Sequence, residues 1–151
     1  MKTRFIKTLA AVLAMLLIIF ASPTYTAFAN GIAVLFNDTE IQFSQPPIER
    51  HGFLFHPLED ILEAIGATWT ADRLNIRGEL NGNTLHVPTG NLRYNVNGAR
   101  FQVPRELEPI IYNDVVYVYI DVIIDAFGMS SSWDGGTRSL VITNWITPIN
   151  R

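Results

Sequence analysis

The chain contains no cysteine, and its only lysines are Lys2 and Lys7. The first absence excludes a disulfide framework, a thiolate metal site and a cysteine nucleophile. The second excludes lysine chemistry, such as a Schiff base, from the rest of the chain. Charged residues make up only 17% of the 151 residues, whereas hydrophobic residues make up 48%. This balance excludes a disordered chain and predicts about one globular domain.

The first 29 residues have the three parts of a secretory signal peptide. Lys2, Arg4 and Lys7 form a positive region, residues 8–20 are almost wholly apolar, and Ala27-Phe28-Ala29 is a small-residue cleavage site. The apolar run is shorter than the roughly 18–20 residues that a stable membrane span needs. We therefore predict cleavage near Ala29 and a secreted protein, extracellular or associated with the cell wall. The alternative is a leader retained as an anchor.

The charge that remains after cleavage is negative. Three of the eleven basic residues leave with the leader, so eight arginines face fourteen acidic residues and the net charge is −6. Nucleic-acid binding needs clustered basic residues that release counterions from phosphates, and the same reasoning disfavours anionic lipids and wall polymers. We therefore expect the partner to be a protein or a neutral glycan of the cell envelope.

The chain contains an internal repeat at an offset of about 62 residues. Residues 57–66 align with residues 119–128, and both segments have apolar side chains at i, i+3, i+4 and i+7. This spacing predicts two short amphipathic helices, and Gly66 and Gly128 are suited to end them in a left-handed conformation. Helices of about nine residues are too short to persist alone in water, so each must pack on a sheet.

The flanking segments predict the strands of that sheet. Asn37-Asp38, Asn81-Gly82 and Asn97-Gly98 are turn signals between strands. The expected strands are 32–36, 40–43, 53–55, 68–71, 74–76, 84–87, 92–96, 100–103, 115–118, 130–133 and 139–143, with 84–87 paired to 92–96. Each copy is therefore β-β-β-α-β, with the copies at about 32–78 and 84–145. We predict one compact α+β domain over residues 30–151, in which two helices pack on an antiparallel sheet.

These motifs resemble the copper amine oxidase N-terminal-like domain, also called the stalk domain. The resemblance rests on Phe36-Asn37-Asp38, Pro46-Pro47-Ile48, the helix motif of residues 57–67 and Trp133-Asp134. It implies an accessory domain that is remote from the copper and the quinone of the oxidases, so it implies neither copper binding nor oxidation. The chain departs from the family pattern at His56, Ala71 and Tyr119, where the usual residues are Val, Trp and Pro.

Candidate catalytic groups are few, and no cofactor is expected. Motifs for phosphate, dinucleotide, zinc or calcium binding are absent from the sequence. One alternative is a small metal-binding or enzymatic protein that uses His51, His56 and His86 with nearby carboxylates. His51 and His56 are five residues apart on an extended segment, which is poor spacing for joint ligation, and ordinary partly exposed histidines are the simpler interpretation.

Aromatic residues are concentrated in the second copy. Tyr117, Tyr119 and Trp133 form a possible ligand face, because aromatic rings stack on sugars and anchor protein interfaces. The simpler interpretation is that they pack in the core. The sequence thus predicts a secreted, non-enzymatic binding or structural module of the bacterial cell surface. A further alternative is a self-assembling envelope subunit whose open sheet edges pair between chains.

Overall fold

The structure, a computed structural model, describes residues 31–73, 75–88 and 93–144. Within these ranges the chain forms the helices α2 (Leu58–Ala64) and α3 (Ile120–Phe127) and the 3-10 helix η1 (Arg105–Leu107). The earlier strands are β1 (Ala33–Phe36), β2 (Thr39–Glu40), β3 (Ile48–Arg50), β4 (Phe53–Pro57), β5 (Thr68–Asp72), β6 (Asn75–Leu80) and β7 (Asn83–Val87). The later strands are β8 (Tyr94–Val96), β9 (Ala99–Phe101), β10 (Ile110–Tyr112), β11 (Val115–Tyr119), β12 (Ser130–Asp134) and β13 (Ser139–Thr143).

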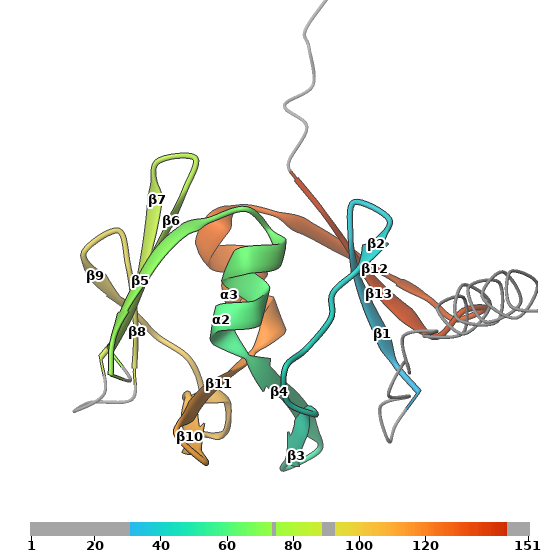
Figure 1. Cartoon of the computed structure of the whole chain (residues 1–151), viewed down its shortest axis with the longest axis horizontal. Helices are drawn as coiled ribbons and strands as arrows, with labels where there is room; N and C mark the ends of the chain where they lie inside the picture. Colours follow the sequence, from blue (N-terminus) through green and yellow to red (C-terminus); the bar gives the residue numbers. More distant parts are fainter. Residues whose placement is uncertain (1–30, 74, 89–92, 145–151) are drawn as a thin grey trace, which may run out of the picture.

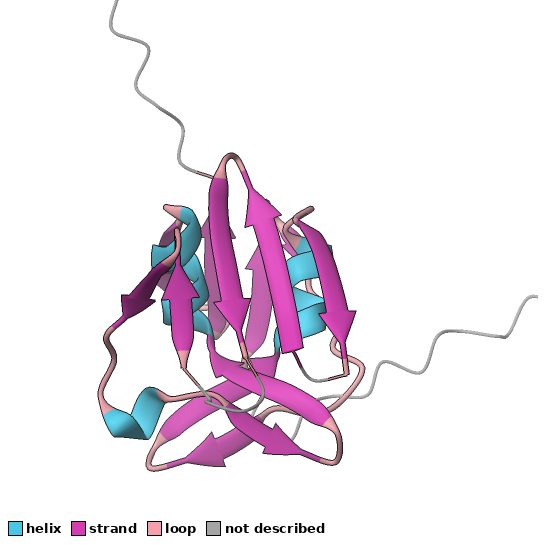
Figure 2. Cartoon of the chain, turned by 90° about the vertical axis from the view of Figure 1, so that its left-hand side faces the viewer, coloured by secondary structure: helices cyan, strands magenta, loops and turns pink. Residues whose placement is uncertain are grey.

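The strands form three sheets around the two helices (Figure 1). Sheet A has the order β12-β13-β1-β2, sheet B the order β10-β11-β4-β3, and sheet C the order β5-β6-β7-β8-β9. The helices lie between sheets A and C, and the strongly twisted sheet B crosses one end of the molecule (Figures 1 and 2). Neighbouring strands are antiparallel, except that β1 and β13 are parallel.

The two halves of the chain exchange strands. β1 and β2 complete sheet A with β12 and β13, while β8 and β9 join sheet C, which also contains β5 and β6. Between them, β4 and β11 pair at the centre of sheet B, with His56 opposite Val118. These two residues are separated by the same 62 positions that relate the helices. An approximate twofold axis therefore passes through the His56–Val118 pair.

Strand β7 breaks this symmetry. In sheet A, β13 pairs directly with β1, whereas in sheet C β7 lies between the corresponding strands β6 and β8. The predicted pairing of 84–87 with 92–96 is confirmed, since Leu85 lies opposite Val96 and His86 opposite Asn95. The insertion gives sheet C a fifth strand that sheet A lacks.

The core lies where the helices meet the three sheets. The predicted apolar stripes of both helices are buried: Leu58, Ile61, Leu62 and Ile65 in the first, and Ile120, Ile123, Ile124 and Phe127 in the second. α2 packs on β5 and β11, and α3 on β7 and β11. Gly66 and Gly128 have φ angles of 74° and 64°, so both helices end in the expected left-handed conformation.

The predicted α+β class is confirmed, and the structure adds detail to it. β3 and β10 are additional strands, joined to β4 and β11 by the two-residue turns His51-Gly52 and Asn113-Asp114. The strand predicted over 40–43 is wrong in position, because β2 ends at Glu40. Pro57 is the last residue of β4, so α2 begins at Leu58.

Some predictions fall outside the described residues. These are the signal peptide of residues 1–29, its cleavage site and the C-terminal end of the second copy at Trp145. Among the residues that the structure does describe, no helix is long and apolar enough to cross a membrane.

Candidate functional site: an aromatic groove

A groove of about 260 Å³ lies where sheet A meets sheet B. One wall is a row of side chains across three strands of sheet A, because Trp133 lies opposite Leu140 and Leu140 opposite Val34. Sheet B supplies Phe53 and Tyr119 to the other wall. Phe53 is 36% exposed and Trp133 is 55% exposed, so the groove presents aromatic rings to solvent.

Tyr119 contacts an aromatic ring of the groove and is hydrogen-bonded to a carboxylate. Its ring meets that of Phe53 edge to face, with the ring centroids 5.4 Å apart. Burial, together with a hydrogen bond from its hydroxyl to Asp121, raises the pKa of Tyr119 to about 12. The phenol therefore stays protonated at neutral pH and donates to the Asp121 carboxylate, which also lines the groove.

His56 lies at the floor of the groove and is only 5% exposed. The interpretation of this residue as an ordinary, partly exposed histidine is therefore wrong. Its position next to the twofold axis of sheet B, packed at 4.8 Å against the Phe43 ring, removes it from water. Within the described residues its Nδ1 has no hydrogen-bond partner. Burial lowers the pKa of the imidazole to about 4, so it is neutral at physiological pH.

The structure brings two of the three predicted ligand-face residues, Tyr119 and Trp133, to this groove. Tyr117 is 3% exposed, which leaves almost none of its surface for a ligand. Sequence reasoning missed Phe53. Its signal was the alternation of Phe53 and Phe55 directly after the His51-Gly52 turn, which places both rings on one face of β4.

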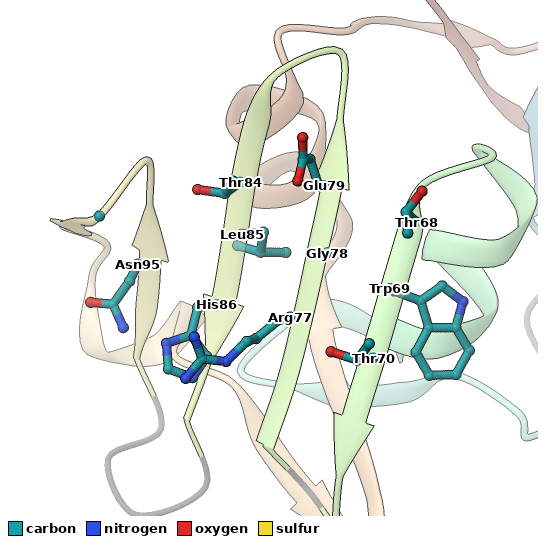
Figure 3. Close-up of a pocket in the computed structure, with 11 residues that line it drawn as sticks. Thr68, Trp69, Thr70, Arg77, Gly78, Glu79, Thr84, Leu85, His86 and Asn95 are labelled. Atoms are coloured by element: carbon teal, nitrogen blue, oxygen red, sulfur yellow. The ribbon is translucent and has the colours of Figure 1, made fainter.

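A second hollow, of about 480 Å³, lies on the outward face of sheet C (Figure 3). One row of side chains crosses all five strands in the order Thr70, Arg77, His86, Asn95 and Arg100. His86 Nε2 donates to Asn75 Oδ1 at 2.6 Å, and partial burial, with a further contribution from Arg77, lowers the pKa of His86. Thr68, Glu79 and Thr84 form a second row beside the first (Figure 3).

The family model of the copper amine oxidase N-terminal domain matches residues 35–142. The chain belongs to this family. In copper amine oxidases the N-terminal domain is non-catalytic. Comparison with curated proteins and with solved structures gave no match.

The fold of this copper amine oxidase N-terminal domain keeps apart the three histidines that a metal-binding protein would have to bring together. His51 lies in the β3–β4 turn, His56 in the centre of sheet B and His86 on sheet C. In the described part of the chain, no three His, Asp or Glu side chains are grouped to hold a metal ion. Of the nearby carboxylates, Asp60 accepts hydrogen bonds from Ser44 N and Ser44 Oγ at 2.7 and 2.8 Å. Asp60 therefore fastens the segment after β2 to the first turn of α2.

Proposed function

We propose that this protein is a secreted, non-enzymatic binding module of the bacterial cell envelope, and that its aromatic groove binds a neutral glycan. The observation that carries the proposal is the exposure of Trp133. This side chain is 55% exposed beside Phe53 and Tyr119 in a preformed groove. Large aromatic side chains bury much apolar area and are normally covered. A cluster left open to solvent is typical of an interaction site.

The groove has two features that suit an uncharged sugar. The flat rings of Trp133 and Phe53 offer apolar faces for the C–H face of a sugar ring. The carboxylate of Asp121 accepts hydrogen bonds and has oxygen lone pairs for sugar hydroxyls in addition to the one that Tyr119 uses. The net charge of −6 after leader cleavage supports a neutral ligand over an anionic polymer.

The test is co-sedimentation of the mature protein with insoluble envelope glycan from which proteins and anionic polymers have been stripped. We expect the wild type to sediment and Trp133→Ala to lose at least about tenfold in affinity, since a central aromatic anchor contributes about 2 kcal/mol or more. Tyr112→Ala is the matched control, because Tyr112 is 56% exposed but lies outside the groove. Equal losses in both variants, or binding only to the protein fraction of the envelope, would contradict the proposal.

Secretion is tested separately. The positive region, apolar run and Ala27-Phe28-Ala29 of the leader support export with cleavage. We expect N-terminal analysis of the protein from the envelope and the medium to show Asn30 as its first residue. A protein that begins at residue 1 or 2 and sediments with membranes would show that the leader is retained.

One observation favours a second candidate, self-assembly. β12 is an edge strand of sheet A whose five residues are all exposed and paired without interruption to β13. It has neither proline nor lysine, the residues that commonly protect a free edge. If this edge pairs between chains, sedimentation velocity will show a dimer or larger species that Ser132→Pro converts to monomer. A monomer at all concentrations would remove this candidate.

A further inference from the structure

The outward face of sheet C has a row of polar and cationic side chains, whereas the equivalent row of sheet A has apolar side chains at its centre. In sheet A, the row that crosses the strands is Ser132, Val141, Leu35 and Glu40. In sheet C the row that corresponds to it is Thr70, Arg77, His86, Asn95 and Arg100, with His86 supplied by the inserted β7. The fold therefore accepts Val141 and Leu35 at the positions where sheet C has Arg77 and Asn95. The polar row is a property of sheet C and is not a requirement of the fold.

The two arginines of this row are available to a ligand. Neither Arg77 nor Arg100 pairs with a carboxylate in the described part of the chain, although the protein is acidic overall. Figure 3 shows the Arg77 side chain beside His86, over the hollow of about 480 Å³. Opposing residues of neighbouring strands lie on the same face, so Arg100 is placed on this face beside Asn95. Partners on successive strands are spaced by about 4.8 Å.

The second row restricts the ligand further. Glu79 lies between Thr68 and Thr84, so an acceptor for hydroxyl groups stands next to the cationic row. A simple anion would be repelled by Glu79. A molecule that has both carboxylates and hydroxyls satisfies both rows, because the carboxylate pairs with guanidinium and the hydroxyls donate to Glu79 and bond to the threonines.

We propose that this face, the cationic row of sheet C, is a second binding site that takes a short acidic oligosaccharide of the uronic acid class, lying across the strands from Arg77 toward Arg100. The negative net charge of the protein favours short oligosaccharides over long polyanions, since the attraction of the row is local and screened within about 8–10 Å. The inserted strand β7 creates the site by adding His86 and Thr84 to the face. The site is separate from the aromatic groove.

The test is a calorimetric titration of the mature protein with trigalacturonate. We expect saturable binding that falls about tenfold or more in Arg77→Gln and in Arg100→Gln, since each loses a charge-assisted hydrogen bond. Arg50→Gln removes the same charge from the exposed β3, outside this face, and should leave the affinity unchanged. Arg77→Val, which copies the residue of the equivalent position in sheet A, serves as a second variant if Arg77→Gln fails to fold.

Two comparisons make the result decisive. The neutral trisaccharide of galactose should bind at least about tenfold more weakly, and Trp133→Ala should bind trigalacturonate like the wild type. Absence of saturable binding, an equal loss in Arg50→Gln, or equally tight binding of tri-glutamate would overturn the proposal. The Trp133→Ala variant tests the two sites independently. If trigalacturonate does not bind, the proposal for the aromatic groove still stands, and if the neutral glycan does not bind in the groove, the proposal for the cationic row still stands.

Discussion

At the scale of single residues, His56 departs most from what its surroundings favour. Its symmetry partner Val118 is fully buried and apolar, whereas His56 brings an imidazole with an unpartnered Nδ1 to the same environment. A buried polar atom without a partner typically costs about 1–3 kcal/mol. His56 also lines the aromatic groove.

His56 makes the protein sensitive to acid. The folded pKa of about 4 lies below the ordinary value of 6.5, so between these values the unfolded chain binds more protons than the folded chain. The contribution of His56 to stability therefore does not change with pH above 6.5, and stability falls as the pH drops from 6.5 to 4, by about 3 kcal/mol in total. We predict that His56→Val removes this decrease and raises stability at pH 7 by about 1 kcal/mol.

The measurement is urea unfolding of the wild type and His56→Val between pH 7 and pH 4. Wild-type stability that stays level across this range would contradict the account, and so would an equal decrease in the variant.

Gly78 is a second residue whose identity follows from packing. A Cβ at this position of β6 would lie 2.8 Å from Leu62 Cδ2 in the buried face of α2. We predict that Gly78→Ala destabilises the fold by about 1–3 kcal/mol, because Leu62 must move within a filled core. Thermal unfolding compared with Gly135→Ala, whose Cβ would meet nothing closer than 3.7 Å, checks this. Equal melting temperatures for the two variants would show that the helix–sheet contact is looser than described.

At the scale of elements, two-residue turns with both φ angles positive set the strand pairing. The sequence signals at Asn37-Asp38, Asn81-Gly82 and Asn97-Gly98 identified three of these hairpins. The turns His51-Gly52 and Asn113-Asp114 have the same geometry but were missed, and with them β3 and β10. Those strands have only three residues each, too few for a period-two pattern to be visible.

Asn97 holds the inserted strand β7 against β8. Its Oδ1 accepts from Thr84 N at 2.8 Å, and its Nδ2 donates to Asn83 Oδ1 at 3.1 Å. We predict that Asn97→Gly, which keeps the positive φ of 51° without strain, lowers stability by about 1–2 kcal/mol through loss of these bonds.

Chemical unfolding checks this against Asn113→Gly. Asn113 has a φ of 48° in a similar turn, and the described structure gives its side chain no hydrogen bond, so we expect a change below about 0.5 kcal/mol. An effect of Asn113→Gly as large as that of Asn97→Gly would show that the turn backbone, and not the side-chain bonds, holds β7.

At the scale of the whole molecule, the repeat could be predicted but the exchange of strands could not. The spacing of Leu58, Ile61 and Leu62 revealed one helix, and the same spacing in the second copy revealed the other. Nothing in that local spacing says that β1 pairs with β13, because the pairing joins residues more than 100 positions apart. For the same reason, the sequence predicted Tyr119 and Trp133 as ligand-face residues, but it did not predict that Phe53 lines the same groove.

The exchange predicts that neither half folds alone. A fragment of residues 31–80 lacks the parallel partner of β1, and a fragment of residues 81–144 lacks that of β13, so each leaves too much apolar surface in water. We predict poorly dispersed NMR spectra for each fragment and a native-like spectrum when the two are mixed at equal concentration. A well-dispersed spectrum from either fragment as a monomer would show that the halves are independent.

The central claim is that this domain binds a neutral glycan through its aromatic groove. Its most direct test is an NMR titration of the labelled mature protein with a soluble neutral glycan fraction of the envelope. The account predicts saturable shifts of the Trp133 indole signal and of amides at Phe53, Tyr119 and Asp121, with the β10 amides near Tyr112 unchanged. Shifts that avoid these four residues, or a spectrum that does not change at saturating glycan, would contradict it.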